Sequence, residues 1–135
     1  MGYKIDEIEG IGPKYAATLG GAGIKTTEAL LEACGTPKGR KDTAASTGLS
    51  EGQLLKWTNM ADLMRISGVG EEFSELLEAA GVDTVKELKM RNADNLAEKM
   101  AEVNATKKLT RAVPSAKTVA KWVAQAKELP PAISY

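Results

Sequence analysis

The sequence predicts an all-α protein made of two repeated units that pack together. Three observations support this prediction. The 135-residue chain has 20 Ala and 13 Leu but only 7 Val and 6 Ile, a balance that favours helices over strands. A pattern of glycines and apolar residues recurs further along the chain, and Gly, Pro, Ser and Thr stand where helices start and stop. With 43% hydrophobic residues, the chain can bury a substantial core.

The repeat aligns residues 5–30 with residues 63–88, without a gap, at an offset of 58. In both copies a short apolar turn ends in Gly-apolar-Gly, and a helix is predicted to start at the second glycine. The aligned pairs are Gly10 and Gly68, Gly12 and Gly70, Tyr15 and Phe73, Gly23 and Gly81, and Thr26 and Thr84. We interpret this register as a duplication, with units at residues 1–58 and 59–135, the second unit including the C-terminal helix.

The first helix of each copy is expected to end at Gly23 or Gly81, because glycine readily adopts the positive φ of a helix stop. Thr26 and Thr84 then N-cap short helices that end near residues 31 and 89. Thr36 opens the next helix, with its stop near residue 48.

Three further helices are predicted from caps and apolar spacing. Ser50 starts a capping box before one helix, Asn92 caps another, and Ser115 opens the last. Two prolines, at positions 130 and 131, end that last helix and leave a short, extended tail.

Several classes of site are excluded by composition. Without His, the chain has no Ser-His-Asp triad and no His-ligated metal, and with Cys34 as its only cysteine it has neither an internal disulfide nor a CxxC site. We therefore predict a protein without catalytic residues, metal or small-molecule cofactor. The sequence has no apolar run long enough to span a membrane and no signal-peptide core, so a cytoplasmic location is expected, with no membrane partner.

The glycine pattern resembles the helix-hairpin-helix motif. The first copy matches it at Ile5, Ile8, Gly10, Ile11, Gly12, Ala16 and Leu19, and the second at Leu63, Ile66, Gly68, Val69, Gly70 and Leu77, with Ser74 in place of the small apolar Ala. Each copy also resembles the N-terminal domain of RecA-family recombinases and the C-terminal domain of the RNA polymerase alpha subunit. The whole chain resembles an uncharacterised family of small bacterial tandem helix-hairpin-helix proteins. This resemblance implies two SAM-like, five-helix units.

The resemblance also implies binding of the DNA backbone without sequence specificity. A Gly-apolar-Gly turn leaves backbone N–H groups unpaired at a helix N-terminus, where the helix dipole favours an anion. At the first hairpin, Gly10, Ile11 and Gly12 form the turn and Lys14 is placed to meet a phosphate. The second hairpin, Gly68-Val69-Gly70, is followed by two glutamates that would repel a phosphate, so we interpret it as structural.

Two basic clusters are further candidates for nucleic-acid contacts. One comprises Lys38, Arg40 and Lys41; the other lies in the basic last quarter of the chain, where Lys117 and Lys121 share a helix face. A solvated face or turn remains the alternative for each cluster.

Taken together, these features predict a non-catalytic accessory protein that binds duplex DNA weakly through its first hairpin. The net charge of zero argues against tight binding to a polyanion. The alternative is a protein-interaction or assembly module that docks another protein or a second copy of itself and binds no nucleic acid.

Overall fold

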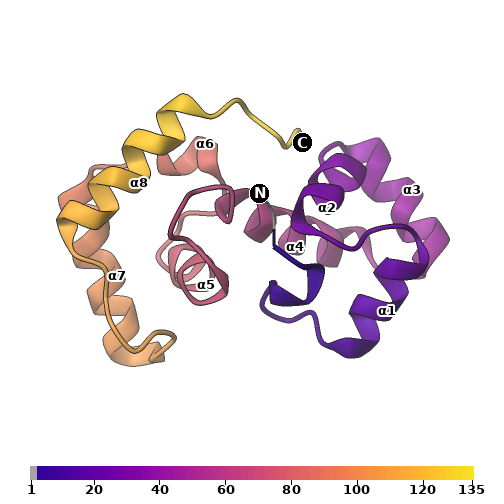
Figure 1. The fold of residues 1–135 in the computed structure, drawn as a ribbon. Helices are drawn as coiled ribbons and strands as arrows, with labels where there is room; N and C mark the ends of the chain where they lie inside the picture. The colour runs from indigo at the N-terminus through magenta and orange to yellow at the C-terminus, as the bar shows by residue number, and fades with distance from the viewer. Residues whose placement is uncertain (1–2) are drawn as a thin grey trace.

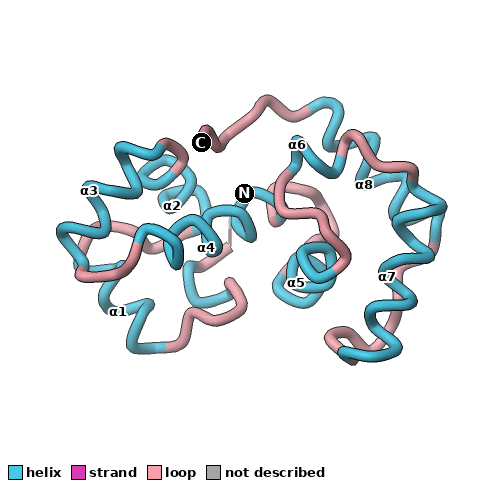
Figure 2. The backbone as a smooth tube through the Cα atoms, turned by 180° about the vertical axis from the view of Figure 1, so that it is seen from behind, coloured by secondary structure: helices cyan, strands magenta, loops and turns pink. Residues whose placement is uncertain are grey.

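The computed structural model describes residues 3–135, and it is all-α as predicted (Figures 1 and 2). A 3-10 turn, η1, precedes eight α-helices, and in this described part the only β feature is an isolated bridge between Lys4 and Thr26. The elements are η1 (Ile5–Glu7), α1 (Pro13–Gly21), α2 (Thr27–Cys34), α3 (Pro37–Thr47), α4 (Glu51–Leu63), α5 (Glu71–Ala79), α6 (Val85–Leu88), α7 (Ala93–Lys107) and α8 (Ala116–Glu128). Within residues 3–135, no helix combines the length and the apolar character needed to cross a membrane.

The predicted N-caps are present, although at Ser50 only the cap forms: within residues 3–135 the Gln53 side chain does not return the second hydrogen bond of a capping box. Each capping side chain accepts a hydrogen bond from the amide three residues ahead, as a helix N-terminus requires. The capping residues are Thr26, Thr36, Ser50, Thr84, Asn92 and Ser115. Helix α2 continues to Cys34, three residues past the expected end, because the sequence offers no helix breaker before Gly35.

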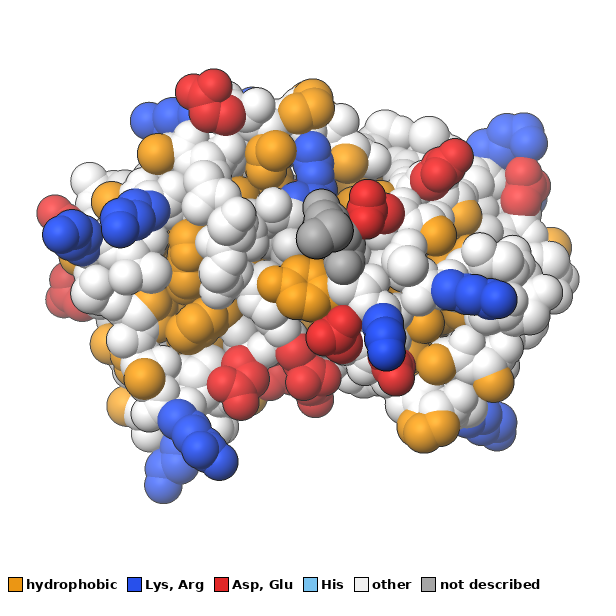
Figure 3. All heavy atoms as spheres, in the orientation of Figure 1, with side chains coloured by type: hydrophobic (Ala, Val, Ile, Leu, Met, Phe, Trp, Pro, Cys, Tyr) orange, Lys and Arg blue, Asp and Glu red, His pale blue; other side chains and the backbone are white. Residues whose placement is uncertain are grey.

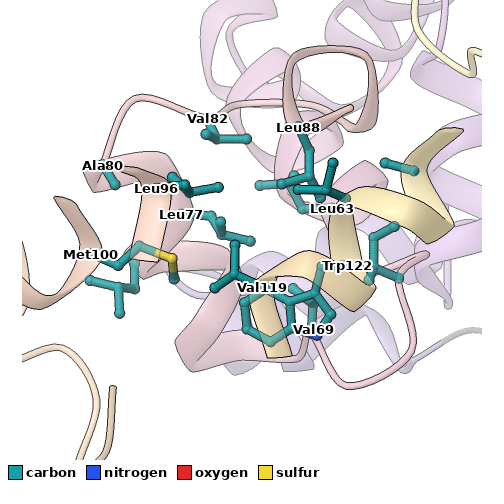
Figure 4. Close-up of a cluster of buried hydrophobic side chains, with 14 of the residues drawn as sticks. Leu63, Val69, Leu77, Ala80, Val82, Leu88, Leu96, Met100, Val119 and Trp122 are labelled. Atoms are coloured by element: carbon teal, nitrogen blue, oxygen red, sulfur yellow. The ribbon is translucent and has the colours of Figure 1, made fainter. Parts of the chain in front are cut away.

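Two hydrophobic clusters form the interior. The first is built from η1, α1, α2 and α4, and the second, shown in Figure 4, from α5 to α8 with the end of α4. Helix α4 belongs to both, since Met60 packs in the first cluster and Leu63 in the second. The predicted unit boundary after residue 58 therefore falls inside a continuous helix.

The two copies of the repeat have equivalent backbone geometry. Gly10 and Gly68 both have φ 93°, in the left-handed region that favours glycine. In each copy, the amide of the apolar residue between the glycines donates to the carbonyl three residues earlier, at 3.1 Å. In each copy the helix after the loop packs an aromatic ring against a tryptophan: the ring centroids of Tyr15 and Trp57 are 5.1 Å apart, and those of Phe73 and Trp122 are 5.2 Å apart.

Helix α4, which both halves share, is tied to the rest of the second half by polar contacts. Asp62 is 2% exposed, and its carboxylate accepts from the Val85 amide and from Arg65 Nη1, both at 2.8 Å. Arg65 Nη2 then donates to the Pro130 carbonyl at 2.8 Å. A buried carboxylate thus ties α4 to α6 and to the segment that follows α8.

The C-terminal tail returns to the first half of the molecule, where Figure 1 places the chain end close to α2. The Ser134 amide donates to the Gly35 carbonyl at 2.7 Å, and Arg40 Nη2 donates to the Ser134 carbonyl at 2.9 Å. A Cβ at position 35 would lie 2.6 Å from the Ala132 carbonyl oxygen, so glycine is needed for the tail to approach.

Replacing Gly10 by Ala tests the left-handed turn. The change should destabilise the protein by about 1–2 kcal/mol, because a Cβ at this φ is strained. Gly20→Ala is the matched control: Gly20 lies in helix α1 with open space at its Cβ position, so this substitution should stabilise by about 0.5 kcal/mol. Urea denaturation measures both; equal effects would contradict the strain argument.

Candidate functional site

The loop before α1, residues 8–12, is the first candidate site. Gly10 turns the chain, and Ile11, 4% exposed, anchors the loop in the first hydrophobic cluster. Gly12 is the N-cap of α1 in an extended conformation, and Pro13 occupies the first helical position. This first loop therefore ends at the N-terminus of a nine-residue helix on the surface of the protein.

Three amides of this segment are free to bind a ligand. A glycine N-cap has no side chain to accept from the first turn, so the helix start is uncapped. Within residues 3–135, the amides of Gly12, Lys14 and Tyr15 have no hydrogen-bond acceptor, whereas the Ile11 amide donates to the Ile8 carbonyl. The Lys14 side chain is exposed, and no carboxylate of the described chain pairs with it. The segment combines free donors, the positive end of a helix dipole and a cation.

The second loop, residues 66–70, has the same backbone but different surroundings. Glu71 and Glu72 occupy the first turn of α5, where they suit the dipole but oppose an anion. The Tyr3 hydroxyl donates to the Val69 carbonyl at 3.3 Å, and the Ser67 amide donates to Gln125 Oε1 at 3.0 Å. Side chains from elsewhere in the protein thus already contact this loop, as the first half meets it on one side and α8 on another.

Carboxylates gather between the two loops. Figure 3 shows acidic side chains together over α5 and the segment before α1. Burial raises the pKa of both Glu71 and Glu75, and the nearby Glu9 carboxylate raises each pKa further by repulsion and by a hydrogen bond. We call Glu9, Glu71, Glu72 and Glu75 the acidic surface. It borders a cavity of about 230 Å³ that Gly10 and Trp57 also line.

The other predicted basic residues do not join the first loop. Arg40 is 6% exposed, and its guanidinium donates to the carbonyls of Cys34 and Ser134, so it holds the tail in place instead of facing solvent with its neighbours. Lys38 and Lys41 are both exposed, and Lys38 forms an ion pair with Asp42 at 2.8 Å. Both of these lysines lie on α3, in the first half of the molecule.

Lys117 and Lys121 are exposed on α8, which packs on the second hydrophobic cluster. Helix α1 and α8 lie in opposite halves of the molecule, as both ribbon views show (Figures 1 and 2). The structure therefore separates these lysines from the first loop and does not form one continuous basic face.

Sequence reasoning missed two contacts that define the site. Glu9 was assigned no role, yet it faces α5 across the interface between the halves. Tyr3 was assigned no role, yet its hydroxyl reaches the second loop. Neither contact has a local signal, because each depends on how the two halves are placed. Within the described chain, no group of three or more Cys, Asp or Glu side chains is arranged to hold a metal ion, the acidic surface included.

A family model described as a domain of unknown function, DUF4332, matches residues 9–129. The chain belongs to this family. The match to DUF4332 covers all eight α-helices, the second loop and the first loop from Glu9 onward, and it leaves Tyr3 and the tail outside. Comparison with curated proteins and with solved structures found no match. Membership of DUF4332 therefore attaches no activity to the site, and its chemistry has to be argued from its geometry.

The acidic surface predicts a pH-dependent effect of Glu75→Gln. Because folding raises the pKa of Glu75, the protonated side chain favours the folded state: this stability is fully present below the unfolded pKa and is lost as pH rises through the folded pKa. The neutral variant should therefore be more stable than the parent at pH 7, by a few tenths of a kcal/mol after solvent screening.

Thermal unfolding of the parent and the variant at pH 7 and pH 4 measures this effect, and the difference should fade at pH 4. Glu98→Gln, the same chemical change at an exposed position on α7, is the control. If Glu75→Gln stabilised the protein as much at pH 4 as at pH 7, the effect would not come from the charge of the Glu75 carboxylate.

Proposed function

We propose that this protein is a non-catalytic, tandem helix-hairpin-helix protein that binds the backbone of duplex DNA without sequence specificity. The first loop and the start of α1 form the contact. The second loop serves as a structural hairpin, and each half corresponds to one helix-hairpin-helix unit similar to those of RecA-family recombinases and the RNA polymerase alpha subunit.

The equivalence of the two loops supports the helix-hairpin-helix assignment. Both have a glycine at φ 93°, a buried apolar residue after it, and a helix that starts at the next glycine. The copies also agree after the first helix, where Ile24 and Val82 each donate to a helix carbonyl at 2.9 Å. A turn of this kind keeps the helix N-terminus at the surface while its apolar residue holds the loop in the core.

The observation that carries the proposal is the set of free amides beside Lys14. A phosphate oxygen at the start of α1 would accept from the Gly12, Lys14 and Tyr15 amides and would lie against the positive end of the helix dipole. Hydrogen bonds from amides to phosphate carry no base information, and Ile11 points into the core, away from any base edge. Binding of this kind is independent of sequence.

The surroundings limit the affinity. The first loop itself carries Glu9 of the acidic surface, two carboxylates follow the second loop in the first turn of α5, and the net charge of the chain is zero. Because few phosphates can be neutralised, each phosphate contact supplies a large share of the binding free energy, and losing one weakens binding strongly. We therefore expect weak binding that falls steeply with salt.

Lys14→Glu tests the proposal directly. The variant should bind a fluorescent duplex of random sequence about tenfold more weakly at low salt, because a charge-assisted contact becomes a repulsion. The dependence of log affinity on log salt should also become shallower by about one phosphate contact. Fluorescence anisotropy at two salt concentrations measures both quantities.

Lys86→Glu is the matched control, because it makes the same charge change at an exposed position on α6. This variant should bind nearly as the parent does. No duplex binding by the parent at low salt, or equal losses in the two variants, would overturn the proposal. The protein-interaction alternative would then be the better one, and the exposed side chains of Met90 and Tyr135, which line one cavity of about 450 Å³, mark the surface to test for it.

A further inference from the structure

The loop between α7 and α8 and the start of α8 present a second concentration of positive charge. We call its five residues the basic end: Lys107, Lys108, Arg111, Lys117 and Lys121. All five are exposed, and none forms an ion pair within residues 3–135. Figure 3 shows basic side chains projecting together near the α7–α8 loop, at the lower end of α7.

The loop that displays these charges is held by a buried side chain. Asn104 is 9% exposed; its Nδ2 donates to the Thr110 carbonyl and its Oδ1 accepts from the Thr110 amide, both at 3.0 Å. The Thr110 hydroxyl donates to the Ala112 carbonyl at 2.8 Å, and Leu109 packs against the second hydrophobic cluster. The loop is therefore ordered before any ligand binds, which lowers the entropic cost of binding.

Requirements of the fold do not account for all of these charges. Lys107 and Lys108 stand at the C-terminus of α7, where cations suit the helix dipole. Lys117, in contrast, stands in the first turn of α8, where the dipole disfavours a cation and where no acidic residue accompanies it. Lys108 also has φ 51°, the one positive φ outside glycine in the described chain, so the chain keeps a long cationic side chain where glycine would be less strained.

The basic end and the first loop lie at opposite ends of the molecule. In both ribbon views α5 stands between α1 and the α7–α8 loop (Figures 1 and 2). Glu71, Glu72 and Glu75 of the acidic surface are on α5. A single straight duplex that touched both ends would bring its phosphates past these carboxylates, and charges of the same sign repel.

We propose that the basic end is a second, separate binding site for the DNA backbone, so that one molecule holds two duplex segments at once. This inference rests on the proposed function for the first loop and extends it from simple binding to bridging. Lys107, Lys108 and Arg111 contact phosphates from the rigid loop, and Lys117 and Lys121 extend the contact along α8.

Capture between two duplexes tests the proposal. One duplex is immobilised on beads, a second duplex of unrelated sequence carries a fluorophore, and the full chain is added at low salt. The parent should retain the fluorescent duplex on the beads. A basic-end variant, Lys108→Gly with Arg111→Ala, should reduce capture by about tenfold or more while its anisotropy still reports binding to one duplex. Lys14→Glu should do the same by removing the other site.

Glycine at position 108 keeps the left-handed turn, so this variant should unfold at a temperature no lower than Arg111→Ala alone. Light scattering of the parent without DNA must show a single chain, since self-association could also join two duplexes. Capture by the monomeric parent that is lost in both variants supports the inference.

The remaining outcomes separate the two proposals. Binding without capture by the parent, or capture that the basic-end variant leaves unchanged, overturns bridging while the function of the first loop stands. If the basic-end variant removes all binding and Lys14→Glu removes none, the first loop is not a site, and both proposals fail. If the parent binds no duplex at all, the proposed function fails, and bridging fails with it.

Discussion

The packing of a glycine turn against a buried tryptophan organises each half of this protein. A Cβ on Gly10 would lie 3.5 Å from Trp57 Nε1, and one on Gly68 3.4 Å from Trp122 Nε1, so the turn and the indole are in close contact in both halves. The positive φ of the glycine aims the next residue into the core and brings the following helix start to the surface. The free amides of the first loop are a consequence of this packing.

Two segments with the same backbone have different chemistry because of what stands beside them. The helix that follows the first loop begins with Pro13 and Lys14, and the helix that follows the second begins with Glu71 and Glu72. The second loop is further occupied by the Tyr3 hydroxyl. The first loop thereby keeps its amides free, whereas the second loop is part of the interface between the halves.

The candidate site was predictable in part. The residues of the first loop and Lys14 follow from local pattern, since a Gly-apolar-Gly turn before a helix needs only short-range geometry to leave amides free. Arg40 was assigned to a basic cluster by its neighbours in sequence, but it is buried, because the tail that returns from α8 supplies a carbonyl for its guanidinium. The proximity of Glu9 to α5 likewise depends on a contact between segments more than sixty residues apart.

The sequence by itself determined the helices, their caps and the equivalence of the two loops, because capping, glycine turns and apolar periodicity act over a few residues. The tertiary structure decided which of those local features meet. Helix α4 carries Leu63 into the second core, the Asp62 carboxylate joins α4 to α6, and the tail closes back on the first half. These contacts fix the mutual orientation of the halves. That orientation places the acidic surface between the two loops and separates the basic end from the first loop. Such placement arises from long-range packing, which no short stretch of sequence encodes.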